Sequence, residues 1–255
     1  MSTIKEFTAE RLSVRVFESR NEMGAVAAKE ATECLVKLLQ EKEAINVLFA
    51  AAPSQNEFLA SLVENREIDW SRVNAFHMDE YIGLDSSHPA GFRNFLKRAI
   101  FDKLPFRSVH LLNGNNPDPD SEALRYAGLL AENTLDVVFM GIGENGHIAF
   151  NDPPVADFND PVFVKVVELE ERCRVQQVND GCFAELNEVP THALTVTIPC
   201  MMKAGHLFCM VPAATKANAV RDTVYGPITT ACPASILRTH PAAKLYLDKD
   251  SGKYI

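Results

Sequence analysis

Three features that this 255-residue sequence lacks, or has little of, limit the class of protein to which it can belong. No stretch approaches the roughly 20 consecutive apolar residues of a membrane-spanning helix, and residues 1–6 show no apolar signal-peptide pattern. Basic residues are scarce, because 25 lysines and arginines face 34 aspartates and glutamates, for a formal net charge of -9. This balance argues against nucleic acid or an anionic membrane as a main partner. We therefore expect a cytoplasmic protein with neither partner, although a local cationic pocket can still bind a small anionic substrate.

Cysteine pairs that would indicate a metal site or a disulfide framework are also missing. None of the six cysteines belongs to a CxxC pair or a zinc-like cluster, and several lie in apolar runs such as residues 207–210. We interpret them as reduced core residues. Because a chain of this length buries enough apolar surface to fold without a metal or disulfide staple, we predict no metal site.

What the sequence contains is a regular alternation of apolar patterns. Periods typical of helices cover residues 21–40, 57–63, 90–103, 120–132 and 216–224. Short runs typical of buried strands cover residues 44–51, 73–78, 109–112, 135–140, 192–198, 206–211 and 244–247. With no linker or repeat between them, we predict one α/β domain over residues 1–255. Its expected core is an open, mostly parallel sheet with helices on both faces, a Rossmann-like three-layer arrangement.

Ligands of such sheets bind beyond the carboxyl ends of the strands, where the strand order reverses. Three segments with chemically useful side chains fall at predicted strand ends: residues 50–55, 77–81 and 141–152. Their shared position predicts one cleft to which all three contribute.

The segment 141–152 combines glycines with a histidine and a carboxylate. Glycines allow a sharp turn beside a ligand, and His147 in such a turn can exchange protons near neutral pH. Asp152 is placed to hold the imidazole in one tautomer, as the third member of a catalytic triad does. A structural histidine with a capping aspartate explains these residue types equally well. The glycine spacing loosely matches a dinucleotide-binding loop, but it lies in mid-chain and no unbroken helix follows, so we predict no nucleotide cofactor.

Two other groups of residues have both a chemical and an ordinary explanation. Asp79 and Glu80 follow a predicted strand, where a carboxylate can move a proton between adjacent carbons of a sugar, although a solvated acidic loop is commoner. Lys216 lies at the start of a predicted helix, a suitable place for a phosphate, and Arg174 offers a second cation. Surface positions are the commoner explanation for both cations.

Together these segments resemble the glucosamine-6-phosphate deaminase (isomerase) family, which is related to the 6-phosphogluconolactonases. The resemblance covers nearly the whole chain, in the family's order. Its most specific elements are residues 78–84 (Met-Asp-Glu-Tyr-Ile-Gly-Leu), 141–153 (Gly-Ile-Gly-Glu-Asn-Gly-His-Ile-Ala-Phe-Asn-Asp-Pro), 189–195 (Val-Pro-Thr-His-Ala-Leu-Thr) and 232–235 (Cys-Pro-Ala-Ser). After the histidine the chain continues Ile-Ala-Phe-Asn, as the deaminases do, whereas the lactonases typically continue Thr-Ala-Ser-Leu-Phe.

The resemblance implies an enzyme that converts an amino-sugar 6-phosphate to fructose 6-phosphate, or an analogous ketose phosphate, and ammonia. Such an enzyme is an isomerase and deaminase of amino-sugar metabolism, described as a hydrolase acting on amino-sugar phosphates, and it needs no metal or nucleotide. His147 would assist ring opening, Asp79 would move the proton between C1 and C2, and Asp152 and Asn145 would complete the histidine's surroundings. The residues expected to bind substrate or phosphate are Ala51, Ala52, Ser54, Gln55, Glu80, Gly143, Gly146, Arg174 and Lys216.

The chain departs from the family pattern around both ends of this site. Asp152 stands where the family usually has glutamate, and Asn145 where the best-known members have aspartate. The family's phosphate loop Thr-Gly-Gly-Thr-Pro is replaced by Phe-Ala-Ala-Ala-Pro at residues 49–53, and the family's phosphate-binding arginine has no clear counterpart. The reaction centre is thus mostly retained while the phosphate site is rebuilt.

Two alternative functions remain open at this point. A 6-phosphogluconolactonase-type lactone hydrolase could use the same histidine loop, and a non-catalytic sugar-phosphate-binding protein would fit the altered phosphate loop. The sequence leaves the sugar epimer, the need for the amino group, allosteric control and the oligomeric state open, and a homo-oligomer is compatible with it.

Overall fold

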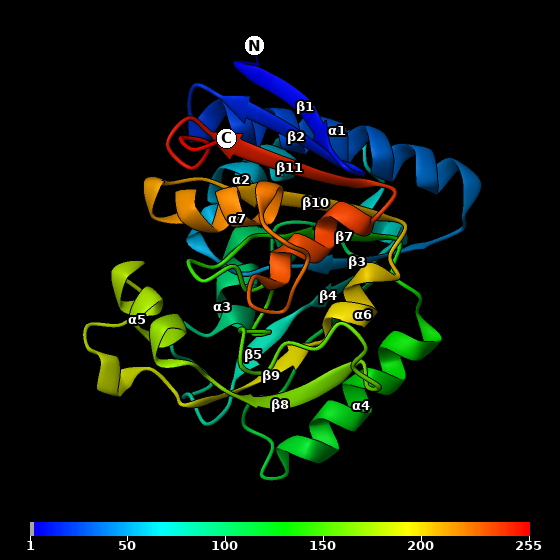
Figure 1. Ribbon diagram of the computed structural model, residues 1–255. Coiled ribbons are helices and arrows are strands. Elements are labelled where there is room, and N and C mark those ends of the chain that lie inside the picture. The colour runs from blue at the N-terminus through cyan, green and yellow to red at the C-terminus, as the bar shows by residue number, and fades with distance from the viewer. Residues whose placement is uncertain (1–2) are drawn as a thin grey trace.

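The computed structural model describes residues 3–255 and is built around an eight-stranded sheet (Figure 1). Residues 1 and 2, which belong to the segment without a signal-peptide pattern, lie outside the described residues. The strand order is β1-β2-β11-β10-β7-β3-β4-β6, and every neighbouring pair except β1–β2 is parallel. The strands are β1 (Lys5–Ala9), β2 (Leu12–Phe17), β3 (Ile45–Phe49), β4 (Val73–His77), β6 (Ser108–His110), β7 (Val137–Met140), β10 (His206–Val211) and β11 (Ala243–Asp248). The predicted open, mostly parallel sheet is confirmed.

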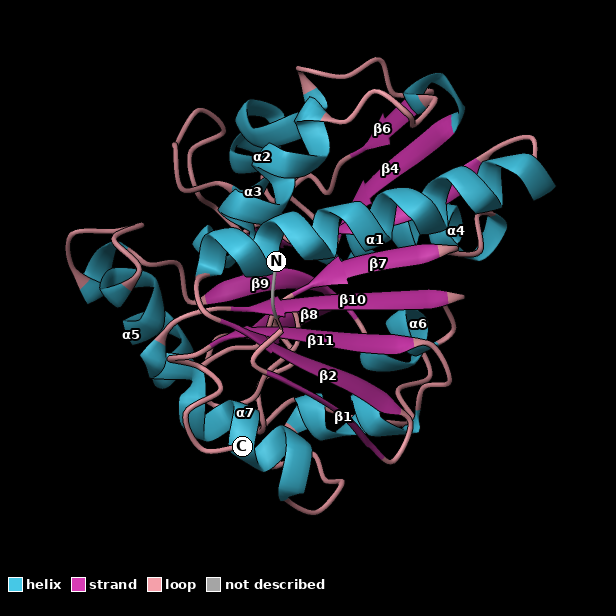
Figure 2. Ribbon diagram, turned by 90° about the horizontal axis from the view of Figure 1, so that it is seen from above, coloured by secondary structure: helices cyan, strands magenta, loops and turns pink. Residues whose placement is uncertain are grey.

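Helices cover both faces of this sheet, as predicted (Figure 2). One face is packed by α1 (Arg20–Glu41), α2 (Asn56–Glu64) and α3 (Phe92–Leu96), whose apolar side chains form one core with those of the sheet. The second core lies on the opposite face, under α4 (Pro119–Glu132), α6 (Ile198–Met202) and α7 (Ala217–Tyr225). Among the described residues, no helix is long and apolar enough to cross a membrane. The cytoplasmic location stays a prediction.

A second, three-stranded antiparallel sheet stands beside the main one. Its order is β5-β9-β8, from β5 (Asp79–Tyr81), β9 (His192–Val196) and β8 (Val164–Glu168). Two expectations were wrong here: residues 79–81 form a strand where a loop was expected, and β9 does not join the main sheet. The reason is that Met78 lies between β4 and β5, so the chain leaves one sheet and enters the other within a single residue.

Two further elements were not predicted from the apolar patterns. The hairpin β1–β2 adds the edge of the sheet, so β11 lies inside it, between β10 and β2, rather than closing it. The α5 helix (Glu171–Asn179) follows β8 and is mostly polar in sequence. Both elements carry or adjoin residues that shape the site described next.

Candidate active site

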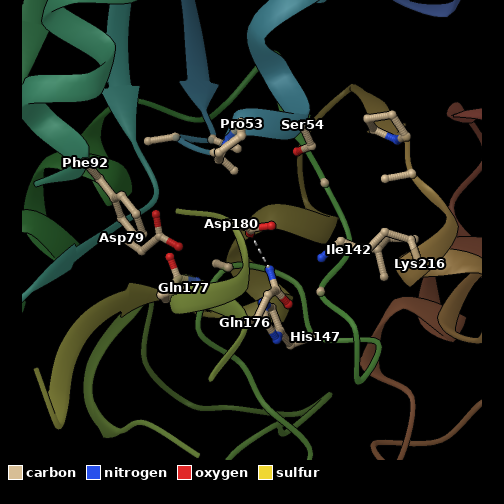
Figure 3. Close-up of a pocket in the computed structure, with 18 of the residues that line it drawn as sticks. Pro53, Ser54, Asp79, Phe92, Ile142, His147, Gln176, Gln177, Asp180 and Lys216 are labelled. Atoms are coloured by element: carbon tan, nitrogen blue, oxygen red, sulfur yellow. Dashed lines mark hydrogen bonds between the residues drawn. The ribbon is translucent and has the colours of Figure 1, made fainter. Parts of the chain in front are cut away.

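The chain forms a cleft at the carboxyl ends of β3, β7 and β10 (Figure 3). The strand order reverses between β3 and β7, because β4 and β6 extend on one side and β10 and β11 on the other. This is the position at which open α/β sheets bind ligands. The space between the walls of the cleft, counted together with the open solvent at its mouth, is about 780 Å³. The α1 and α5 helices and the end of β4 complete its walls.

A buried network surrounds His147 on one wall of the cleft. The Nδ1 atom of His147 lies 2.7 Å from Oδ1 of Asn145 and 2.8 Å from Oδ1 of Asp152. Asp152 is 1% exposed and His147 is 8% exposed. Burial alone would raise the pKa of Asp152, but the His147 charge and the hydrogen bonds from His147 and Asn145 lower it below its ordinary value. An ionised Asp152 therefore accepts from Nδ1, which leaves Nε2 of His147 as the ring nitrogen free to exchange protons.

Two glycines give the His147 loop its shape. A Cβ atom on Gly143 would lie 2.1 Å from Cε1 of the His147 ring, so a larger residue there would displace the imidazole. Gly146 has a φ of +85°, which favours glycine, and its neighbour on the other side is Cys232. The loop also holds Ala149 at a φ of 51°, an uncommon conformation for a residue with a side chain. These constraints place the imidazole against the backbone with little freedom to move.

Asp79 and Glu80 are adjacent carboxylates in opposite environments. Neighbouring residues of a strand point to opposite faces, and the Asp79 side chain enters the cleft. Burial, together with the Glu80 charge, raises the pKa of Asp79 well above its ordinary value. Glu80 points away from the cleft and accepts the backbone N–H groups of Phe92 at 3.1 Å and Arg93 at 2.9 Å. Despite burial, the nearby His77 and these N–H groups lower the pKa of Glu80. Carboxyl groups with pKa values pushed apart are typical of sites with divided acid and base roles.

The far wall of the cleft is cationic. Lys216 lies at the end of the short 3₁₀ turn Ala214–Lys216, just before α7, and is only 6% exposed. Burial lowers its pKa, while Asp180 and Glu144 act in the opposite direction. Arg20, the first residue of α1, also lines the cleft and is held by Glu57 and by the backbone oxygen of Pro53. Lys216 and Arg20 both line the cleft, and cations in such a position suit an anionic group.

The α5 helix and the C-cap residue that follows it supply three polar residues to the cleft: Gln176, Gln177 and Asp180. Gln176 accepts the backbone N–H of Glu144 at 2.9 Å and donates to Asp180 at 3.3 Å. Figure 3 shows the Gln177 amide beside the Asp79 carboxylate in projection, and both side chains line the same cleft. These side chains can orient sugar hydroxyl groups.

Known proteins similar to this chain show its family. The model of the glucosamine-6-phosphate isomerases/6-phosphogluconolactonase family matches residues 18–246. The chain belongs to this family. It is 36% identical over 227 residues to the glucosamine-6-phosphate deaminases of Bacillus thuringiensis (strain Al Hakam) and Bacillus cereus (strain AH820), a match that covers 88% of this chain and 84% of each relative.

Solved structures agree with this assignment. A monomeric glucosamine-6-phosphate deaminase superposes with a TM-score of 0.85 at 25% identity, over 95% of this chain and 99% of that one. The 6-phosphogluconolactonase of Thermotoga maritima gives 0.73 at 18% identity, over 92% and 99% of the two chains, and so shares the fold. Membership in the family, predicted from the motifs, is confirmed.

The structure brings most of the expected site residues of this family member to the cleft, but not all. The residues found in its walls are Asp79, His147, Ala51, Ala52, Ser54, Gly143 and Lys216, with Asn145, Asp152 and Gly146 directly behind them. Three expected substrate-binding residues lie elsewhere. Glu80 holds the start of α3, and Arg174 donates to the backbone oxygens of Leu186 and Val189. Gln55 is fully buried and donates to backbone oxygens at the ends of β7 and β10.

Sequence reasoning missed Arg20, Thr215 and the three polar residues of α5 as members of the site. Arg20 had a usable signal, since it follows strand β2 and the helix-capping Ser19, but β2 was not predicted. The α5 residues lay in a segment that departs from the family pattern, so no motif pointed to them. Their contribution depends on where the helix docks, which the sequence does not state.

One group of described residues has the donor set of a metal site. Donor atoms of His147, Asp152 and Cys173 lie within 4.8 Å of one another. The Nδ1 atom of His147 that a metal would need is already hydrogen-bonded to Asp152. The expected lack of a metal stays a prediction.

Proposed function

We propose that this chain is a glucosamine-6-phosphate deaminase that converts the amino-sugar phosphate and one water to fructose 6-phosphate and ammonia. The observation that carries the proposal is the placement of Asp79, His147 and the buried Lys216 in the walls of one cleft. The 36% identity to curated deaminases over most of both chains supports it. Because the overall reaction consumes water, the description as a hydrolase is part of this proposal.

The first step is opening of the sugar ring. We assign it to His147, whose Nε2 takes the proton of the C1 hydroxyl and returns it to the ring oxygen as the bond from that oxygen to C1 breaks. The Nδ1 side is held by Asp152 at 2.8 Å, so the ring nitrogen that faces the cleft keeps its lone pair.

The second step moves a proton between two carbons. We assign it to Asp79, whose carboxylate removes the C2 proton of the opened sugar and delivers it to C1. The C1 oxygen gains a proton as the amino group loses one, so the product is an alcohol at C1 and an imine at C2, and the imine adds water and releases ammonia. A buried base with a raised pKa is suited to this transfer, because it binds the proton more strongly than an exposed aspartate.

The phosphate is proposed to lie between Lys216, Arg20 and Ser54. Lys216 and Arg20 provide charge, and Ser54 provides a hydroxyl at the start of the turn after β3. Arg20 would take the place of the family's phosphate-binding arginine, which has no match in the α5 segment. The rebuilt loop at residues 50–54 thus retains an anion site with different donors.

The test is an assay of ammonia and fructose 6-phosphate released from glucosamine 6-phosphate by the wild-type chain and by Asp79→Asn. We expect turnover by the wild type and a loss of about 10²- to 10⁴-fold in the variant. Hydrolysis of 6-phosphogluconolactone is measured in the same preparations. A lactonase moves no proton between carbons, so lactone turnover that is unaffected by Asp79→Asn, without ammonia release, would overturn the proposal.

A further inference from the structure

Behind His147 lies a chain of hydrogen bonds that ends on Glu170, a residue to which the deaminase reaction assigns no role. The Asn145 side-chain NH₂ group donates to Oδ1 of Asp152 at 2.8 Å and to Oε2 of Glu170 at 2.6 Å. Its oxygen accepts from Nδ1 of His147 at 2.7 Å and from the His147 backbone N–H at 3.1 Å. Asn145 therefore has all four of its hydrogen-bonding positions occupied.

The His147 backbone N–H and the two carboxylates together set which way the Asn145 amide faces. An ionised carboxylate only accepts, so the NH₂ group must point to Asp152 and Glu170 and the oxygen must point to His147. An oxygen at 2.7 Å from Nδ1 requires a proton on that nitrogen. In a neutral imidazole the proton on Nδ1 leaves Nε2 unprotonated, which is the form that the proposed ring opening needs.

Asp152 and the His147 backbone N–H favour this arrangement of Asn145, and Glu170 adds a third contact that favours it. If the amide were turned over, its oxygen would face both carboxylates and its NH₂ group would face Nδ1 of His147. That orientation is opposed once by Asp152 and a second time by Glu170, whose bond is the shorter of the two. Charge-assisted bonds of this kind are roughly twice as strong as neutral ones.

We propose that Glu170 is a positioning residue that acts through Asn145 and adds to the direct bond from Nδ1 to Asp152 in fixing the tautomer of His147. The best-known family members carry a negative charge at position 145 itself. In this chain Asn145 is neutral, and Glu170, which accepts a hydrogen bond from it, supplies the charge. The proposal rests on the proposed role of His147 in ring opening. It extends the reaction machinery to the residue that precedes α5.

A purely structural role for Glu170, in docking α5, is the competing explanation. The helix has other bonds to the same loop, since Gln176 accepts the Glu144 N–H at 2.9 Å and Arg172 donates to the Glu144 oxygen at 3.3 Å. The Glu170 side chain makes no capping bond to the helix itself. Docking of α5 therefore does not depend on Glu170 alone.

The experiment compares Glu170→Met, which keeps the length of the side chain but not its acceptors, with Glu170→Gln, which keeps one acceptor. We expect kcat on glucosamine 6-phosphate to fall about 10- to 100-fold in Glu170→Met with little change in KM, because the imidazole of His147 is held less firmly in one tautomer. Glu170→Gln should recover part of this loss. Glu171→Gln removes the exposed neighbouring acid and should match the wild type.

A charge exchange separates positioning from docking. Asn145→Asp alone brings three carboxylates together and should lower kcat, whereas Asn145→Asp combined with Glu170→Gln should recover activity. A docking residue predicts no such recovery, so a double variant as impaired as the worse single variant would contradict the proposal.

The tautomer itself is read by long-range ¹H–¹⁵N NMR of ¹⁵N-histidine-labelled protein, with His147→Gln to assign the signals. We expect the proton on Nδ1 in the wild type and a shift of population toward Nε2 in Glu170→Met. An unchanged tautomer in Glu170→Met would overturn the proposal, whatever happens to kcat. Because this measurement needs no substrate, it remains decisive even if the chain does not turn over glucosamine 6-phosphate.

Discussion

At the level of single residues, the ionised form of Asp79 lowers the stability of the folded protein. Its pKa is raised above the ordinary 3.8 by burial and by Glu80, so ionising it destabilises the folded state. Below pH 3.8 the group is protonated whether the chain is folded or not, and the wild type and Asp79→Asn should be equally stable. As the pH rises through the window between the unfolded and folded values, the wild type loses stability relative to the variant.

We therefore predict that Asp79→Asn removes turnover and yet raises the melting temperature at neutral pH. A gain of about 1 kcal/mol corresponds to roughly 2–4 °C for a chain of this size. Thermal unfolding of both proteins at pH 3 and pH 7 checks this. A variant less stable than the wild type at pH 7, or a difference independent of pH, would show that Asp79 is not held at a raised pKa.

Gly143 gives a second prediction at this scale. A Cβ atom there would fall 2.1 Å from the His147 ring, so Gly143→Ala must push the imidazole out of place. Because small misplacements are expensive in rate, we expect kcat to fall about 100-fold while KM changes little. Gly128→Ala in α4 is the control, since a Cβ there meets nothing and an alanine favours the helix. Equal activity of the two variants would argue against the contact with His147.

At the level of elements, the short turn before α7 positions Lys216, a residue of the proposed phosphate site. Ala213 has a φ of 86° and its N–H donates to Asp248 at 3.1 Å, which directs the turn and Lys216 into the cleft. We predict that Lys216→Met raises KM for the sugar phosphate by about 10- to 100-fold, the equivalent of 1.5–3 kcal/mol for a hydrogen bond to a charged group.

The matched control for Lys216 is Lys37→Met, which removes an exposed lysine from α1 outside the cleft. Inorganic phosphate should compete with substrate in the wild type and in the control, and compete more weakly in Lys216→Met. If phosphate inhibits all three proteins equally, the anion site lies elsewhere.

Elements also show what could be predicted from the sequence and what could not. The strands β3, β7 and β10 are buried on both faces, so their continuous apolar runs identified them and located the cleft. The edge strand β1 is half polar and β5 is three residues long, so neither contains a continuous apolar run that would predict a strand. The same limits explain why Glu80 was expected to bind substrate and why Arg20 was not expected in the cleft. Without β5 the opposite faces of Asp79 and Glu80 were invisible, and without β2 Arg20 had no strand end to follow.

At the level of the whole molecule, the negative total charge and the cationic wall of the cleft have opposite signs. A net charge of -9 repels an anionic substrate at long range, while Lys216 and Arg20 attract it at short range. The family motifs located the reaction centre because its residues lie in two short continuous segments, residues 78–84 and 141–153. The proposed phosphate site is assembled from α1 and from the turns after β3 and β10, segments far apart in sequence that only the fold brings together.

The same view of the whole molecule predicts its assembly. The edge strand β1 carries Lys5 and Glu6, and the other edge, β6, has three residues, features that discourage pairing between sheets. Exposed large apolar side chains such as Leu124 on α4 and Tyr254 near the carboxyl end belong to separate elements. We predict a 28.2 kDa monomer in sedimentation equilibrium, with specific activity unchanged on dilution. A dimer whose activity falls on dilution would mean that a surface outside the cleft supports the site.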